Sequence, residues 1–248
     1  VQPMTKRWRD KEYTIVYNGE LYNTAPLREM LLQRGYSFTT ESDTEVLLTA
    51  FIEWQEGCTA YLNGIYAFAV WDASNKQLFM CRDRLGVKPF FYRHLGSGLL
   101  FASEIKALLA HEEVDAAITV DGLAAVLSLG PSRIPGDGIF HEVKEIKPGC
   151  AMVINRQGSR SWRYWDIASK VHQDNLQQTV ENVRVLVTDA IERQLVSDVP
   201  LCTLLSGGLD SSIITAVAAN HYKTSQKRLH TFSVDFESNT SYFEKNAF

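Results

Sequence analysis

Several signatures of particular protein classes are missing from this sequence of 248 residues. The four cysteines, Cys58, Cys81, Cys150 and Cys202, form no C-x-x-C pair, which argues against a zinc site or a disulfide framework. Lys and Arg form no run, and the net charge of −4 argues against a nucleic-acid-binding surface. No apolar stretch approaches the roughly 18 residues of a membrane span. The 45% hydrophobic and 22% charged residues instead predict a globular protein of two domains, with reduced, cytosolic cysteines.

One further absence concerns a nucleotide-binding pattern. Val199–Leu205 is apolar enough for a short buried strand, and Ser211–Tyr222 has the apolar spacing of a helix that lies on a sheet. The intervening sequence is S-G-G-L-D-S-S and has no lysine, which the Walker pattern requires. A strand that turns through paired glycines into a helix presents unpaired backbone N–H groups and the positive end of a helix dipole. The stretch therefore predicts a phosphate-binding loop.

Asp210 lies inside this loop and is the candidate metal ligand. Its carboxylate could hold Mg²⁺ against the phosphates, while the neighbouring serines donate to phosphate oxygens. An ordinary helix start capped by Asp210 or Ser211 is the alternative interpretation. The septet resembles the pyrophosphate-binding loop of the N-type ATP pyrophosphatases, which cleave ATP between the α and β phosphates to adenylate a carboxylate.

The residues before about position 166 favour an α+β fold with many antiparallel connections. The helical spacing predicts helices over Ala25–Arg34, Asp43–Gln55, Ser103–Leu109 and Val120–Leu129. Strands are predicted over Tyr13–Tyr17, Ile65–Trp71, Gln77–Arg82, Pro89–Arg93, Leu99–Ala102, Ala151–Asn155 and Arg160–Trp165. Asn18-Gly19 directly after the first strand is typical of a type I′ hairpin turn, and that interpretation stays open.

A domain boundary is predicted near Asp166–Asn175, where the strand pattern stops. An amphipathic helix over Leu176–Val196 follows, and His230–Phe236 predicts a second strand. We expect domains at residues 1–168 and 175–248, the second being the start of an α/β doubly wound parallel sheet. Two strands and one crossover cannot close such a sheet, and the sequence starts at Val1, so we expect a fragment of a longer polypeptide.

Five phrases in the first domain share one resemblance. They are YNGELYN (Tyr17–Asn23), ESDTEV (Glu41–Val46), RDRLGVKP (Arg82–Pro89), FASEIKAL (Phe101–Leu108) and Pro148-Gly149. Together with the later septet they resemble, in the same order, the glutamine-hydrolysing asparagine synthetase family. The resemblance covers essentially the whole chain.

The resemblance implies a class II glutamine amidotransferase. Its first domain would be an αββα sandwich similar to the N-terminal-nucleophile hydrolases, truncated here at its start. Ammonia from glutamine would reach the second domain, where aspartate is adenylated with Mg²⁺ and ATP and converted to asparagine, with release of AMP and pyrophosphate. Glutamine, aspartate and ATP would be the substrates, the enzyme would be cytoplasmic, and a homodimer is left open.

Carried over residue by residue, the resemblance implies two sites. In the first, Asn18 and Gly19 would form the oxyanion hole, Glu20 would help to hold glutamine, and Asp43 would pair with its α-amino group. The second would bind ATP through Leu205, Ser206, Gly207, Gly208, Leu209, Asp210, Ser211, Ser212 and Val234, with Asp210 as the Mg²⁺ ligand.

The sequence departs from the family at the nucleophile. In the family this is an N-terminal cysteine whose own amino group acts as base, and Val1 cannot replace it. The sequence as written is therefore expected not to hydrolyse glutamine. Two alternatives stay open: a relative that adenylates another carboxylate, such as a β-lactam synthetase, and a non-catalytic nucleotide-binding module. Intact Asn18-Gly19-Glu20 and Asp43 argue against decay of the first domain.

Overall fold

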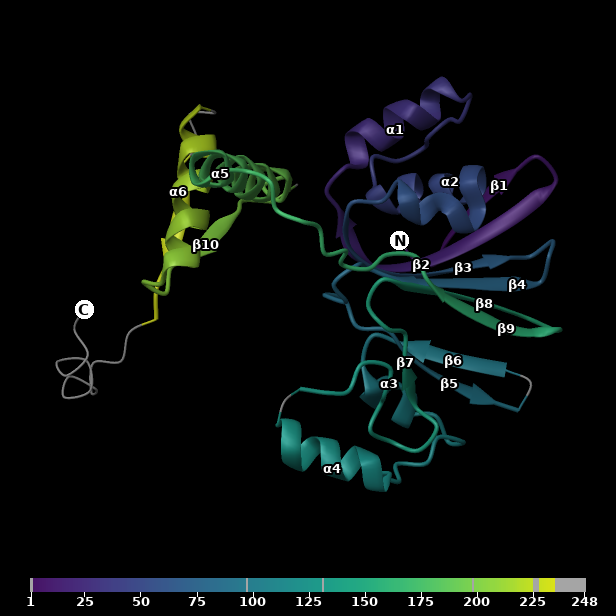
Figure 1. Ribbon diagram of the computed structural model, residues 1–248. Helices are drawn as coiled ribbons and strands as arrows, with labels where there is room; N and C mark the ends of the chain where they lie inside the picture. Colours follow the sequence, from purple (N-terminus) through teal and green to yellow (C-terminus); the bar gives the residue numbers. More distant parts are fainter. Residues whose placement is uncertain (1, 97, 131, 198, 225–227, 235–248) are drawn as a thin grey trace. The chain divides into compact units, whose positions relative to one another are not determined.

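The computed structural model describes residues 2–96, 98–130, 132–197, 199–224 and 228–234. The chain divides into two compact units, residues 1–169 and 170–248 (Figure 1). Each unit is considered by itself. None of the helices in the described ranges combines the length and the apolar character that crossing a bilayer requires.

The larger sheet of the first unit has six strands, all paired antiparallel, in the order β1-β2-β3-β4-β8-β9. The strands are β1 (Met4–Trp8), β2 (Lys11–Leu21), β3 (Gly64–Asp72), β4 (Gln77–Arg82), β8 (Cys150–Asn155) and β9 (Gly158–Arg163). The expected antiparallel α+β character is confirmed. The polar strand β1 was not predicted, because its intermediate and exposed residues leave no apolar pattern.

Strand β2 continues through Asn18, Gly19 and Glu20, so the hairpin interpretation of Asn18-Gly19 is wrong. Asn18 lies opposite Ala67 of β3, and Gly19 lies opposite Tyr66. A Cβ on Gly19 would overlap with the Ile65 carbonyl oxygen and would lie 2.7 Å from the Tyr66 Cα. Glycine is therefore required here by the close approach of β3 and not by a turn.

Helices α1 (Thr24–Gln33) and α2 (Asp43–Trp54), followed by the 3₁₀ helix η1 (Gln55–Ala60), cover one face of this sheet (Figure 1). The main core lies between these helices and the sheet. Its members are almost fully inaccessible to solvent, among them Ile15, Leu47, Phe51, Phe68 and Phe79. This apolar burial fixes α2, and with it Asp43, over the end of β2.

A smaller antiparallel sheet, in the order β6-β5-β7, packs on the other face of the large sheet. Its strands are β5 (Phe91–Leu95), β6 (Gly98–Ala102) and β7 (Lys144–Glu145). Ala67, Ala69 and Met80 of the large sheet meet Phe90, Tyr92 and Ile146 in the layer between the sheets. Phe91 faces the opposite way and packs with Leu108 of helix α3 (Ile105–Leu109).

Helices α3 (Ile105–Leu109) and α4 (Val120–Leu129) lie on the side of the small sheet away from the large one (Figure 1). The unit thus runs helices, sheet, sheet, helices. The expected start of α3 at Ser103 is wrong: the N-cap is Glu104, without a side-chain cap bond, and Ser103 is bonded elsewhere.

The second unit contains α5 (Leu176–Arg193), β10 (Cys202–Leu204), α6 (Leu209–Thr224) and β11 (His230–Phe232). Strands β10 and β11 pair in parallel across α6, so the predicted strand–helix–strand connection is confirmed. A doubly wound sheet is not seen in the residues that the structure covers, and Asp235 and Phe236 of the predicted last strand lie outside them.

The predicted inward face of α5 is not buried in this unit. Val180, Val183 and Val187 are 50%, 53% and 39% exposed, and Ala190, Ile191 and Leu195 are not buried either. A two-stranded sheet offers too little apolar surface to cover an 18-residue helix. The helix ends at Arg193, three residues before its predicted end.

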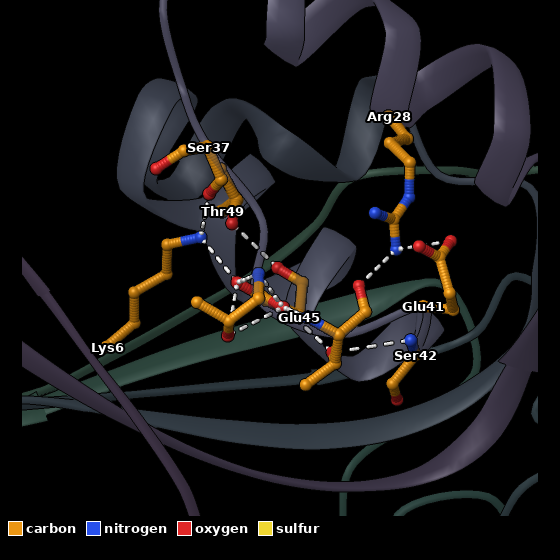
Figure 2. A network of polar contacts seen from close by, with 9 residues as sticks. Lys6, Arg28, Ser37, Glu41, Ser42, Glu45 and Thr49 are labelled. Carbon is orange, nitrogen blue, oxygen red and sulfur yellow. Dashed lines mark hydrogen bonds and ion pairs between the residues drawn. The ribbon is translucent and has the colours of Figure 1, made fainter.

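A polar network holds the chain that leads into α2 (Figure 2). The Glu45 carboxylate accepts from the backbone N–H groups of Thr39 and Thr40 and from the Thr40 hydroxyl, and it pairs with Lys6 Nζ at 2.8 Å. Lys6 also donates to the Ser37 carbonyl oxygen at 2.7 Å. Ser42, the N-cap, accepts from the backbone of Thr44. The network therefore joins β1 to the start of α2.

Burial alone would raise the pKa of Glu45, but hydrogen bonds from Lys6, Thr40 and Thr39 outweigh it and lower the pKa to about 2. A carboxyl whose pKa is lowered by folding stabilises the folded state fully above its unfolded pKa of 4.5. This contribution is lost as the pH falls from there to about 2.

We expect Glu45→Gln to lower the free energy of unfolding at neutral pH by roughly 3 kcal/mol. The difference from the wild type should shrink as the pH falls through the window from 4.5 to about 2, because a protonated carboxyl and an amide are similar. Urea unfolding across that pH range measures it. Glu41→Gln is the control, since the Glu41 side chain is 97% exposed and its ion pair with Arg28 is long, at 3.5 Å. A difference that is independent of pH would contradict the assignment.

Candidate functional site

Asn18 lies at a cavity between the two sheets. The cavity has a volume of about 310 Å³ and is lined by Gln2, Val16, Tyr17, Asn18, Ala67, Phe90, Phe101, Ala102 and Ser103. Asn18 Nδ2 donates to Ser103 Oγ at 3.0 Å, which leaves the second Nδ2 hydrogen without a protein acceptor among the described residues. The amide thus presents a fixed donor beside the cavity.

The backbone N–H of Gly19 supplies a second donor nearby. The Gln2 side chain bonds both backbone groups of Tyr17, accepting from its N–H at 2.6 Å and donating to its carbonyl at 2.7 Å. Tyr17 therefore turns its peptide groups toward the β1 edge, and Gly19, two residues on, turns the same way. Consistently, the carbonyl of Tyr66, which lies opposite Gly19, accepts from Asp83 N on its other side. The Gly19 N–H points to the sheet edge just beyond Gln2.

Asp43 is the first residue of α2 and lies at the end of β2. Its Oδ2 accepts from the Tyr17 hydroxyl at 2.8 Å and from Leu21 N at 3.3 Å. Burial, and then the charge of Asp43, raises the pKa of Tyr17, so the phenol remains a donor. Because Oδ1 has no donor in the described part of the chain, the carboxylate keeps one oxygen for a cationic partner.

The four residues predicted for this site do not all touch. Tyr17 links two of them, because it lines the cavity beside Asn18 and its hydroxyl holds Asp43. Glu20 is exposed on β2, opposite Ile65, and makes no hydrogen bond or ion pair with the described residues. The structure therefore places the Asn18 side-chain amide, the Gly19 backbone N–H and the Asp43 carboxylate around the end of β2.

Two residues with a clear part in this geometry were missed in the sequence. Tyr17 and Ser103 both lie within phrases that carry the family resemblance, yet neither was given a role. Tyr17 appeared to be an ordinary strand residue and Ser103 a helix cap. Their true contacts cross 26 and 85 residues of sequence, a separation that local patterns do not reveal.

The glycine loop of the second unit is open. Gly207 has a positive φ of 83°, and a Cβ on it would meet nothing within 4 Å among the described residues. Within the same part of the chain, the N–H groups of Gly207 and Gly208 have no hydrogen-bond partner. These amides lie between the end of β10 and the start of α6, an arrangement that suits an anion.

The serines around this loop are engaged with the loop itself. Ser206 and Ser211 share a hydroxyl contact of 3.1 Å, and the Ser211 and Ser212 hydroxyls donate to the Gly208 carbonyl. Of the other predicted residues, Leu209 is 76% and Val234 is 84% exposed, while Leu205 N donates to the Phe232 carbonyl. These hydrogen bonds hold the loop in one conformation and leave the space beside Gly207 open among the described residues.

Asp210 is in the first turn of α6 and has no protein partner in the described ranges. No group of three or more His, Cys, Asp or Glu side chains comes together there as a metal site. A single carboxylate beside free amides fits Mg²⁺ that is shared with substrate phosphates, since Mg²⁺ commonly takes only one or two protein carboxylates.

Family models match parts of both units of the chain. The family model described as "Glutamine amidotransferase domain" matches residues 1–165, and the chain belongs to this family. A second model, described as "Asparagine synthase", matches residues 182–247, which include the glycine loop.

Among curated relatives, asparagine synthetase (glutamine-hydrolyzing) 3 of Bacillus subtilis (strain 168) is 56% identical over 100% of this chain and 40% of its own length. Asparagine synthetase (glutamine-hydrolyzing) 1 of the same organism is 35% identical, over 95% of this chain and 36% of the relative. The chain thus spans about two fifths of the length of these relatives.

Among solved structures, the glutamine phosphoribosylpyrophosphate amidotransferase from B. subtilis, complexed with ADP and GMP, is 19% identical, with a TM-score of 0.47. That match covers 94% of this chain and 48% of the other. A protein from Silicibacter pomeroyi described as a "glutamine aminotransferase class-II domain protein" is 15% identical, with a TM-score of 0.39 over 61% of this chain and 67% of the other.

Proposed function

We propose that the full-length protein containing this chain makes asparagine from aspartate and ATP, using ammonia released from glutamine and yielding AMP and pyrophosphate. The observation that carries the proposal is the Asn18 amide donor at a cavity, beside the Gly19 backbone N–H at the sheet edge, in a chain of the glutamine amidotransferase family. The 56% identical relative named asparagine synthetase supports the same reaction.

In the first unit, Asn18 Nδ2 and the Gly19 N–H would donate to the oxyanion that forms when the glutamine amide is attacked. Asp43 would accept from the α-amino group through its free oxygen, and Glu20 would help to hold the substrate. The N-terminal cysteine nucleophile implied by the family would come from the full-length protein. The helix–sheet–sheet–helix order supports an N-terminal-nucleophile hydrolase fold over residues 1–168.

In the second unit, residues 175–248 would begin a doubly wound ATP pyrophosphatase domain. Free amides at Gly207 and Gly208 support a pyrophosphate site over Ser206–Ser212, with Leu205 and Val234 near the adenine. Asp210 would hold Mg²⁺, which supplies charge neutralisation at the phosphates when bound. We place the enzyme in the cytoplasm, which agrees with four free cysteines.

Replacing Asn18 tests the first site. We expect Asn18→Ala in the full-length enzyme to lower kcat for glutamine hydrolysis by about 10²-fold to 10³-fold, because one oxyanion donor is lost. Synthesis supplied with ammonia should be unchanged, and it serves as the internal control. Steady-state assays of glutamate release and of AMP release measure both. A normal glutaminase rate in this variant would remove the proposed role of Asn18.

Ser103 is expected to act as a positioning residue for Asn18. Ser103→Ala removes the acceptor at 3.0 Å, so the amide can rotate, and kcat for glutamine hydrolysis should fall about tenfold with KM little changed. Ser103→Thr keeps the hydroxyl and should restore most of the rate. Equal effects of alanine and threonine, or a change in KM alone, would contradict this role.

Replacing Asp210 tests the second site separately. We expect Asp210→Asn to abolish AMP formation while glutaminase activity survives, because only the metal ligand of the ATP site is changed. The matched control is Asp189→Asn on α5, whose carboxylate is paired with Arg193 on the helix surface. AMP release at the wild-type rate in Asp210→Asn would exclude Asp210 as the Mg²⁺ ligand. Screening other carboxylic acids for AMP release identifies the acceptor.

A further inference from the structure

A second and larger cavity, of about 660 Å³, opens where three hairpins of the first unit end. The β3–β4, β5–β6 and β8–β9 hairpins all turn at the same end of the two sheets (Figure 1). Leu78, Leu99 and Ile154 line the cavity and also belong to the apolar layer between the sheets. The floor is therefore the outer end of a packed apolar core.

The rim of this cavity is cationic. Lys76 and Arg156 come from two of the turns, and His94 comes from the end of β5. Among the residues that the structure describes, no Asp or Glu lines the cavity. The acid nearest in sequence, Asp72, is 2% exposed, and it accepts from the N–H groups of Ser74 and Asn75. The Asp72 carboxylate is therefore hydrogen-bonded within its own turn and does not line the cavity.

Within the described ranges, Lys76 and Arg156 differ from Arg7 and Arg160 of the large sheet in having no ion-pair partner. Lys76 and Arg156 make no ion pair with the described residues. By contrast, Arg160 pairs with Glu56 at 2.6 Å, and Arg7 pairs with Glu12 at 2.7 Å. Two uncompensated positive charges at the mouth of one cavity create a local field that favours an anion.

Trp71 adds an aromatic wall. It is the last large side chain of β3 before the turn, it lines the cavity, and it is 42% exposed. Indole offers a wide apolar surface on which a planar group can stack. The cavity thus combines an apolar floor and wall with a positive rim, and its size is in the range of small-molecule sites.

We propose that this cavity binds a small organic carboxylate with a planar, apolar body. The body lies against Trp71 and the floor, and the carboxylate accepts from the Arg156 guanidinium and the Lys76 ammonium. Glutamine and aspartate lack such a body, ATP carries its charge on phosphates and has no carboxylate, and none of the cavity residues belongs to the two sites described above. The site is therefore additional to the proposed reaction and does not depend on it.

Titration calorimetry on the full-length protein, with 1-naphthoate as the probe, tests the proposal. We expect one site per chain, unaffected by glutamine and ATP, and binding about tenfold weaker for neutral 1-naphthalenemethanol because the charge contact is lost. Added salt should weaken the binding of naphthoate but not of the alcohol. Acetate, which has the carboxylate but no aromatic ring, should not bind measurably.

Variants locate the site. The double variant Lys76→Gln, Arg156→Gln should weaken naphthoate binding about tenfold, whereas Arg160→Gln, a neighbouring arginine outside the cavity, should not. Quenching of tryptophan fluorescence by naphthoate should be reduced in Trp71→Phe. An unchanged urea midpoint shows that each variant is folded. Absence of binding, equal binding of the alcohol, or equal effects of the double variant and Arg160→Gln would overturn the proposal.

Discussion

The strict alternation of side chains along one uninterrupted strand, β2, is the constraint on which the first unit depends. Tyr17 faces the helical layer and reaches Asp43, whereas Asn18 faces the second sheet and reaches Ser103. This division exists only because β2 does not turn at Gly19, where the missing Cβ lets β3 pass close by. A single-residue slip would exchange the two faces and separate both contacts.

Buried polar groups anchor the layers that carry these contacts. Arg82 at the end of β4 is almost fully buried, pairs with Glu145 at 2.8 Å, and donates to the carbonyls of Lys88 and Ile146. Asp83 accepts from the backbone of Val87 and Lys88, so the charged turn after β4 is structural. The small sheet, and with it Ser103, is thereby tied to the large sheet by more than apolar contact.

Local patterns predicted the elements whose cause is local. Helix α2 was placed within one residue because Ser42 caps it and its apolar stripe is regular, and β4 was placed at its observed ends. Strand β1 and the course of β2 through Asn18-Gly19 were not, because strand pairing decided them against turn propensity. The contact of Ser103 with Asn18 was missed for the same reason. The apolar face of α5 was predicted to pack on a large sheet, and it is exposed because the described residues form only two strands there.

The cavity beside Asn18 and the cavity beside Trp71 differ in the kind of charge they can stabilise. The packed layer of Met80, Phe90 and Phe101 lies between the sheets, so each end of the layer opens separately. At one end the donors, the Asn18 amide and the Gly19 N–H, are neutral. Neutral donors attract a permanently charged anion only weakly, but they suit negative charge that develops during a reaction. At the other end Lys76 and Arg156 carry permanent charge, which instead favours an anion that arrives already charged. One sandwich thus has neutral donors at one end of its central layer and permanent positive charge at the other.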